Sequence, residues 1–284
     1  MALLNALIVT VLAVAGGLAV TAALCIDVEQ LRRTAGSLEQ RLTNVAPYLA
    51  VTAVFFLGKR ATHGTTLEIS KSLDWNLTDE IYAIEGLFVA HLQDFTPNVT
   101  YDFFSAMYMF GFPFLLVFPL LAYFLLPSGR YLKELLMAYL LNYFIGTLFY
   151  TLFIVRGPRN RVPDAVAEPM YELYPQTQDL TAAVSANTNV FPSLHTSLAV
   201  AAAIIAWRSR EEYPRWFKIS AFVATCIVLS TMILGIHWLI DVIAGLVLAV
   251  VSVWGAIRIV DWGENKRSGT NDAISGGAPT STDD

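Results

Sequence analysis

Two ionisable residues, His237 and Asp241, stand in one of the most apolar parts of this chain, within the sequence Gly-Ile-His-Trp-Leu-Ile-Asp. An ionisable side chain at membrane depth is costly and by default marks a functional site. Residues four apart share one face of a helix, so Asp241 could accept the proton of one ring nitrogen of His237. The other nitrogen could then act as a base, a nucleophile or a metal ligand. The simpler alternative is a structural role, in which the histidine and the aspartate only satisfy each other's hydrogen bonding at a helix end.

A second cluster contains Ser193 and His195, within Phe-Pro-Ser-Leu-His. Pro192 suits the first position of a helix, which would place both residues in the first turn. Unpaired backbone N–H groups and the helix dipole favour an anion there. The hydroxyl and the imidazole could bind a phosphate and protonate its leaving oxygen. The alternative is a helix cap with a structural histidine.

The third cluster is a loop with three arginines, Arg156, Arg159 and Arg161, stiffened by Pro158 and Pro163. Guanidinium groups on a rigid loop are suited to an oxyanion such as phosphate. A basic loop that touches lipid headgroups is the alternative.

Together the clusters describe phosphoryl transfer through a phosphohistidine. His237 would attack phosphorus while Asp241 holds its ring, and His195 would protonate the departing group. The arginines would neutralise the charge on the equatorial oxygens. Metal binding by His195, His237 and Asp241 is disfavoured, because hard-ion sites use several carboxylates and only one is present.

The composition predicts what kind of fold must position these residues. The chain has 284 residues, of which 56% are hydrophobic and only 14% charged, so we expect an all-α, polytopic membrane bundle with one membrane domain. The net charge of −5 gives no indication of nucleic-acid binding. Cys25 and Cys226 both lie in apolar runs, which predicts neither a disulfide framework nor a metal cluster.

Seven apolar runs are predicted to span the membrane. No basic residue precedes the first run, so no cleaved leader is expected. We expect the tail over 263–284 to be disordered. The predicted spans are residues 1–26, 45–57, 103–127, 132–155, 191–206, 217–236 and 239–257.

A polar stretch from 58 to 102 separates the second and third spans. Thr78-Asp79-Glu80 resembles a helix start, with a capping hydroxyl followed by acids. Apolar residues at three- and four-residue spacing then predict one helix that lies at the membrane interface or caps the bundle. These residues are Ile81, Ile84, Phe88, Leu92 and Phe95.

Basic residues predict the orientation. The segments 27–44, 128–133, 207–218 and 258–284 hold 12 of the 18 lysines and arginines. The positive-inside rule therefore predicts an external amino terminus, a cytoplasmic tail and an extracytoplasmic site. Glycosylation sequons at Asn76 and Asn98 agree with this topology but are weak signals.

Over roughly 150–250 the chain resembles the type 2 phosphatidic acid phosphatase and vanadium haloperoxidase superfamily, whose motifs are K-x6-RP, PSGH and SR-x5-H-x3-D. Pro192-Ser193-Leu194-His195 matches the second motif except for leucine in place of glycine. The segment from Gly235 to Val242, with Ala244 and Gly245, matches the end of the third. The resemblance implies a six-helix core, here spans two to seven within a catalytic domain over residues 45–257, with the first span, residues 1–26, as an addition. We expect the site to need no metal or other cofactor.

Three further departures from these motifs affect the expected function. Thr231 stands where the third motif has arginine, Leu152 stands where the first has lysine, and proline precedes Arg159 instead of following it. The leucine in Pro-Ser-Leu-His and the sequence Ser-Thr-Met in place of Ser-Arg resemble the inositol phosphorylceramide synthase branch. Members of that branch transfer the phosphoryl group to an alcohol.

We therefore expect an integral membrane phosphatase acting on a lipid phosphate or polyprenyl phosphate or diphosphate. A phosphotransferase that uses a lipid alcohol or an inositol-type head group is the first alternative. A protein that binds lipid phosphates without turnover is the second, because the motif arginine and lysine are missing. The site residues expected are His237, His195 and Asp241 for catalysis, and Arg159, Arg156, Arg161 and Ser193 for phosphate.

Overall fold

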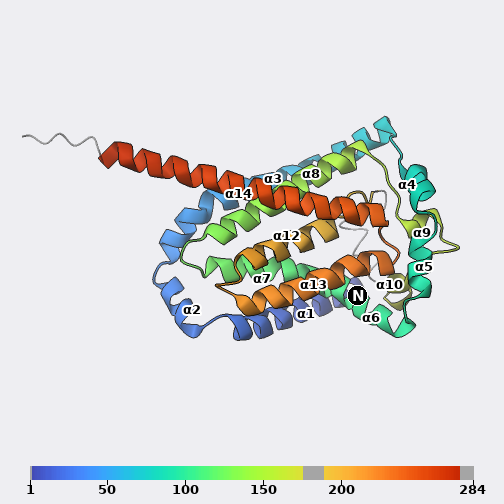
Figure 1. Cartoon of the computed structure of the whole chain (residues 1–284), viewed down its shortest axis with the longest axis horizontal. Coiled ribbons are helices and arrows are strands. Elements are labelled where there is room, and N and C mark those ends of the chain that lie inside the picture. Colours follow the sequence, from blue (N-terminus) through green and yellow to red (C-terminus); the bar gives the residue numbers. More distant parts are fainter. Residues whose placement is uncertain (1, 175–188, 276–284) are drawn as a thin grey trace, which may run out of the picture.

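A computed structural model describes residues 2–174 and 189–275 of the chain (Figure 1). The described part is all-α and contains no strand, which confirms the predicted fold class. Its long helices are α1 (Ala2–Cys25), α3 (Leu38–Leu73), α7 (Phe112–Phe124), α8 (Arg130–Leu152), α12 (Leu194–Arg208), α13 (Pro214–Ile233) and α14 (Leu239–Ser275). The shorter helices are α2 (Val28–Ala35), α4 (Thr78–Glu85), α5 (Phe88–Asp94), α6 (Tyr101–Ala106), α9 (Pro158–Arg161) and α10 (Pro169–Leu173).

The long helices run along the long axis of the molecule, and α4, α5, α6, α9 and α10 gather at one end, on the right of Figure 1. We call this end the site end. The amino termini of α12 and α14 both point toward it, as does the carboxyl end of α8. The three motif-bearing segments therefore converge there although they are far apart in the sequence.

Within the described residues, six helical segments are long and apolar enough to cross a membrane. They correspond to six of the seven predicted spans. The remaining span corresponds to α12, which has only 15 residues. Because α12 packs against α7, α8, α13 and α14, it is enclosed by protein and need not match the thickness of the bilayer alone.

Two boundaries differ from the predictions. The second span was expected to end at Leu57, but α3 continues to Leu73 and stops at Asp74, whose backbone is left-handed (φ 47°). Helix-forming lysine, arginine, leucine and glutamate residues follow the apolar run and allow the helix to continue. The tail was expected to be disordered from residue 263, yet α14 runs to Ser275, and residues 276–284 lie outside the described part.

The single interfacial helix expected from Thr78 is in fact two helices. Gly86, with φ +56°, separates α4 from α5 and changes the chain direction, which few other residues permit. Only Ile81 of the predicted apolar face is buried, whereas Ile84 is 75% exposed and Phe95 87% exposed. We call α4 and α5 the outer cap.

A charged network fixes three helices at the opposite end of the bundle. Glu134 of α8 is fully buried and accepts hydrogen bonds from Arg130 (2.9 Å) and from Arg208 of α12 (3.1 Å). Arg130 also pairs with Asp261 (2.5 Å) and Glu264 (3.2 Å) of α14. A buried carboxylate requires such partners, so α8, α12 and α14 are held in one register far from the site end.

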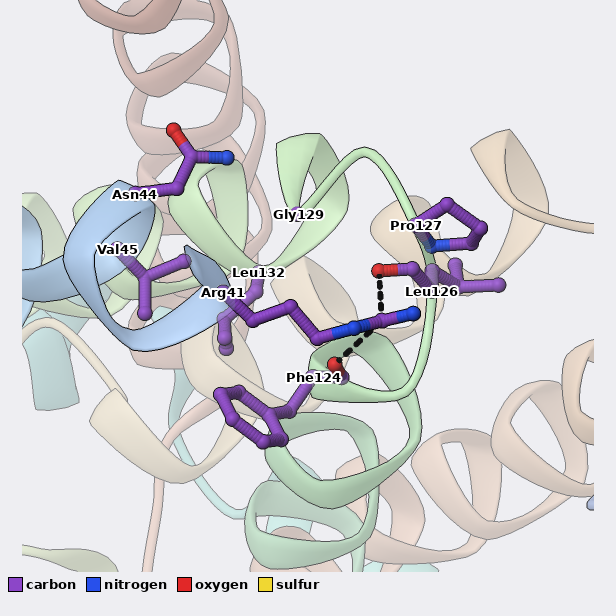
Figure 2. Close-up of a pocket in the computed structure, with 8 residues that line it drawn as sticks. All are labelled: Arg41, Asn44, Val45, Phe124, Leu126, Pro127, Gly129 and Leu132. Atoms are coloured by element: carbon purple, nitrogen blue, oxygen red, sulfur yellow. Dashed lines mark hydrogen bonds between the residues drawn. The ribbon is translucent and has the colours of Figure 1, made fainter. Parts of the chain in front are cut away.

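A small cavity of about 10 Å³ also lies at that opposite end, between α3, α7 and the start of α8 (Figure 2). Arg41 points into it and donates hydrogen bonds to the carbonyl oxygens of Phe124 (3.2 Å) and Leu126 (2.7 Å). The guanidinium thus provides hydrogen-bond donors for carbonyl oxygens at the carboxyl end of α7, which have no partner within the helix. The cavity has room for no more than a water molecule and does not provide a lipid site.

Candidate active site

His237 lies on the turn between α13 and α14, not on a helix as its spacing from Asp241 suggested. Gly235 has φ +69°, and a Cβ atom there would lie 2.8 Å from the carbonyl oxygen of Ala167, so the turn requires glycine. The backbone N–H groups of Ile236 and His237 both donate to the carbonyl oxygen of Thr231 (3.0 Å each). These contacts fix the backbone that carries the imidazole.

Asp241 occupies the first turn of α14 and is fully buried. Its Oδ2 lies 3.3 Å from Nδ1 of His237 and accepts a hydrogen bond from the backbone N–H of Trp238 (2.9 Å). Its Oδ1 has no hydrogen-bond partner among the described residues. The carboxylate therefore both caps the helix and orients the imidazole.

The electrostatics keep His237 neutral. Burial and the nearby positive charge of Arg159 together lower its pKa to about 3, although a contact with the backbone of Val190 opposes them. A neutral imidazole that donates Nδ1–H to Asp241 carries its lone pair on Nε2. This is the form required of a nucleophile.

The second cluster is joined to the first through the backbone. Ser193 donates its N–H to the carbonyl oxygen of Asp241 (3.0 Å), so the amino termini of α12 and α14 are directly linked. Gly245 permits this approach, because a Cβ atom there would lie 2.6 Å from the carbonyl oxygen of Ser193. The site therefore rests on a close crossing of two helices.

The start of α12 differs by two residues from the prediction. Pro192 is not the first helical residue: it follows a cis peptide bond, and Ser193 is the N-cap, whose Oγ accepts from the N–H of Thr196 (3.3 Å). His195 still falls in the first turn. Its ring contacts the rings of Tyr108 and Phe112, with centroid distances of 4.4 and 4.3 Å.

Of the three arginines, only Arg159 is buried, with 8% exposure. Its guanidinium lies over the ring of Tyr171 (4.3 Å) and donates from Nη2 to the Tyr171 hydroxyl (2.9 Å), with Glu168 3.9 Å away. Its Nη1 has no hydrogen-bond partner among the described residues. A buried donor without a partner is costly, which suits a group that receives an anion.

The other two arginines are not buried. Arg161 donates from Nε to Asp79 of α4 (2.7 Å) and lies over the ring of Tyr82. Arg156 has an exposed side chain, and its backbone bonds the hydroxyl of Thr78 and the indole of Trp238. The structure therefore brings together His237, Asp241, Ser193, His195 and Arg159, and does not bring Arg156 or Arg161 into that group.

Comparison with known proteins identifies the family of the chain. The sequence profile described as the PAP2 superfamily matches residues 86–255, more than half of the chain. The chain belongs to the PAP2 superfamily. An uncharacterized protein of Methanocaldococcus jannaschii is 28% identical over 151 residues, which cover 52% of this chain and 58% of that relative. No solved structure matches.

The PAP2 superfamily generally comprises phosphatases and phosphotransferases, and the six long apolar helices among the described residues suit an integral membrane protein. The structure also accounts for two of this PAP2 chain's motif departures. Leu194, in place of the motif glycine, packs closely against Gly146 of α8. A Cβ atom on Gly146 would collide with the leucine side chain. Thr231, in place of the motif arginine, is buried, bonds the carbonyl oxygen of Val228 (2.7 Å) and supports the His237 turn through its own carbonyl.

One residue beside the PAP2 site was not identified from the sequence. Glu85, the last residue of α4, accepts hydrogen bonds from the backbone N–H groups of Leu239 (2.9 Å) and Ile240. Burial raises its pKa, while these two hydrogen bonds oppose the rise. The outer cap therefore holds the amino terminus of α14 next to Asp241. No local pattern indicates a contact across 154 residues.

Replacing Glu85 tests this link. Glu85→Ala removes both acceptors and should lower the free energy of unfolding by about 1–3 kcal/mol, whereas Glu85→Gln keeps one acceptor and should lose less. Thermal unfolding of the purified protein in detergent measures the difference. Glu80→Ala, at an exposed position on the same helix, is the matched control. Equal stability of the two alanine variants would mean that the cap does not stabilise α14.

Proposed function

We propose that this protein is a lipid phosphate phosphatase that works through a phosphohistidine on His237, without a metal. The observation that carries the proposal is the buried His237–Asp241 pair beside Arg159, whose Nη1 lacks a partner within the described part of the chain. A neutral nucleophile, an orienting carboxylate and a cation with a vacant donor together suit attack on a phosphate.

In the first step Arg159, the Ser193 hydroxyl and the first N–H groups of α12 hold the phosphate. The lone pair on Nε2 of His237 forms the N–P bond while the bond from phosphorus to the leaving oxygen breaks. The leaving oxygen keeps that electron pair and takes a proton from Nε2 of His195. Asp241 stabilises the positive charge that develops on the His237 ring.

In the second step a water molecule attacks phosphorus and gives its proton to His195. The N–P bond breaks, its electron pair returns to His237, and phosphate leaves. Both histidines are then back in their starting states. An alcohol in place of water would yield a new phosphate ester by the same route, which is the phosphotransferase alternative suggested by the motif departures.

Turnover of a panel of lipid phosphates by the purified protein tests this proposal. The panel should include phosphatidic acid and polyprenyl phosphates and diphosphates, with and without an inositol-type or lipid alcohol and in the presence of a chelator. We expect release of inorganic phosphate that the chelator does not reduce. Transfer to the alcohol without release of phosphate would favour the phosphotransferase, and binding without turnover would favour a lipid-phosphate binding protein.

We further propose that the site end faces the extracytoplasmic side, that the carboxyl terminus is cytoplasmic, and that residues 45–257 form the catalytic unit with α1 as an addition. The distribution of basic residues supports this orientation. In this orientation the active site would lie at the level of the outer headgroup layer.

Accessibility of single cysteines should report the orientation. Asp164 lies in the exposed loop at the site end and Glu211 in the exposed loop between α12 and α13. In a Cys25→Ser, Cys226→Ser background, Asp164→Cys should react with an impermeant thiol reagent in intact cells, and Glu211→Cys only after lysis. Labelling of Glu211→Cys in intact cells would reverse the proposed orientation.

A further inference from the structure

Residues 107–111 form one π-helical turn between α6 and α7. Such turns are rare inside helices and occur often at functional sites. Here the turn carries Tyr108 and is followed directly by Phe112, and both rings contact His195. Sequence patterns did not mark either residue, because aromatic residues are common throughout the apolar spans.

The contact between Tyr108 and His195 is specific in geometry. The two rings are stacked, with centroids 4.4 Å apart and an interplanar angle of 24°. The phenol oxygen lies 3.4 Å from Nδ1 of His195. Phe112 contacts the imidazole as well, with its centroid 4.3 Å away and its plane tilted by 43°.

Tyr108 also belongs to the wall of the site. It is 9% exposed and packs in one cluster with Tyr171, the residue that holds Arg159, and with Ile236, the residue before His237. A buried imidazole nitrogen needs a hydrogen-bond partner, and the phenol is the partner that the structure gives to Nδ1.

We propose that Tyr108 is a positioning residue that reserves Nε2 of His195 for proton transfer. The phenol oxygen accepts a hydrogen bond from Nδ1–H, so Nδ1 keeps its proton in both the charged and the neutral ring. Only Nε2 then gains and loses a proton. This proposal rests on the role of His195 given under the proposed function.

The proposed mechanism uses the acid form of His195. In the first step the imidazolium gives the Nε2 proton to the leaving oxygen, which keeps the electron pair of the broken bond to phosphorus. The neutral ring then takes a proton from water in the second step. The negative phosphate beside the ring favours the imidazolium, and the aromatic face of Tyr108 contributes an attraction for the same charge.

The variant Tyr108→Phe tests the role of the hydroxyl independently of the role of the ring. Phenylalanine keeps the stacking on His195 but lacks the oxygen that accepts the hydrogen bond. An alkyl phosphate needs protonation of a strongly basic leaving alkoxide, whereas p-nitrophenyl phosphate releases a weakly basic nitrophenolate. We expect the first turnover of the alkyl ester to slow by about 10- to 100-fold. We expect first-turnover release of nitrophenol, and the affinity for orthovanadate, to stay within about twofold of the wild type because neither needs the acid.

Tyr123→Phe is the matched control. Tyr123 lies in the same transmembrane segment, is fully buried, and bonds Ser209 (2.9 Å) at the opposite end of the bundle. Equal rates for Tyr108→Phe and wild type on the alkyl ester would overturn the proposal, and so would equal slowing with both esters. His195→Ala tests the underlying mechanism separately: if it still turns over the alkyl ester, His195 is not the acid and that step of the proposed mechanism fails first.

Discussion

His237→Ala should abolish turnover of lipid phosphates, with a loss on the order of 10⁴-fold or more. The buried imidazole is the nucleophile in the proposed mechanism, and alanine provides no atom that can form the bond to phosphorus. Initial rates with the best substrate of the panel measure the loss. A radiolabelled phosphoryl group should also be trapped on the wild type as an acid-labile adduct, and not on the variant.

Asp241→Asn completes this test because it keeps the shape of the side chain and removes its charge. The amide can still accept from the N–H of Trp238, but it no longer fixes the ring of His237 in the reactive tautomer. We expect a loss of about 10²- to 10⁴-fold with little change in folding. Substantial turnover by His237→Ala would exclude the phosphohistidine mechanism, whatever the result with Asp241.

Arg159→Lys should reduce turnover by about 10- to 100-fold although it conserves the charge. A guanidinium can bond Tyr171 with one nitrogen and phosphate with another, whereas an ammonium cannot reproduce that planar arrangement. Orthovanadate is a phosphate analogue that can become five-coordinate on His237. It should inhibit the wild type and bind Arg159→Lys more weakly by a similar factor.

Arg161→Lys is the control for this experiment. Arg161 lies on the same short helix, but it pairs with Asp79 and is 38% exposed at its side chain. Its replacement should leave vanadate affinity unchanged. If both lysine variants behave like the wild type, the loop is only a membrane-surface patch, and the phosphate must be held by Ser193 and the amino terminus of α12.

The sequence predicted the parts of the site that follow from residue type and local spacing. His237, Asp241, Ser193 and His195 are close together at one end of the bundle, as the alternation of spans predicted. Local rules were less accurate for backbone detail. The four-residue spacing of His237 and Asp241 suggested one helix, whereas the left-handed Gly235 keeps His237 outside α14.

Contacts between distant segments could not be predicted in this way. The sequence analysis expected the loop arginines Arg159, Arg156 and Arg161 to bind phosphate. Only the fold places Arg161 beside Asp79, and Glu85 beside the start of α14. These pairings depend on how the outer cap folds back, which no pattern within one segment encodes.

The exposed Ile84, Phe88 and Phe95 of the outer cap have a consequence for kinetics. Apolar side chains on the outside of such short helices favour partial immersion in the headgroup layer, so an enzyme with the proposed function would meet its lipid substrate in two dimensions. Its apparent KM is then a mole fraction of lipid in the surface. Diluting the substrate with an inert lipid should slow turnover even at constant total concentration, so a cell could regulate the rate through the composition of one leaflet alone.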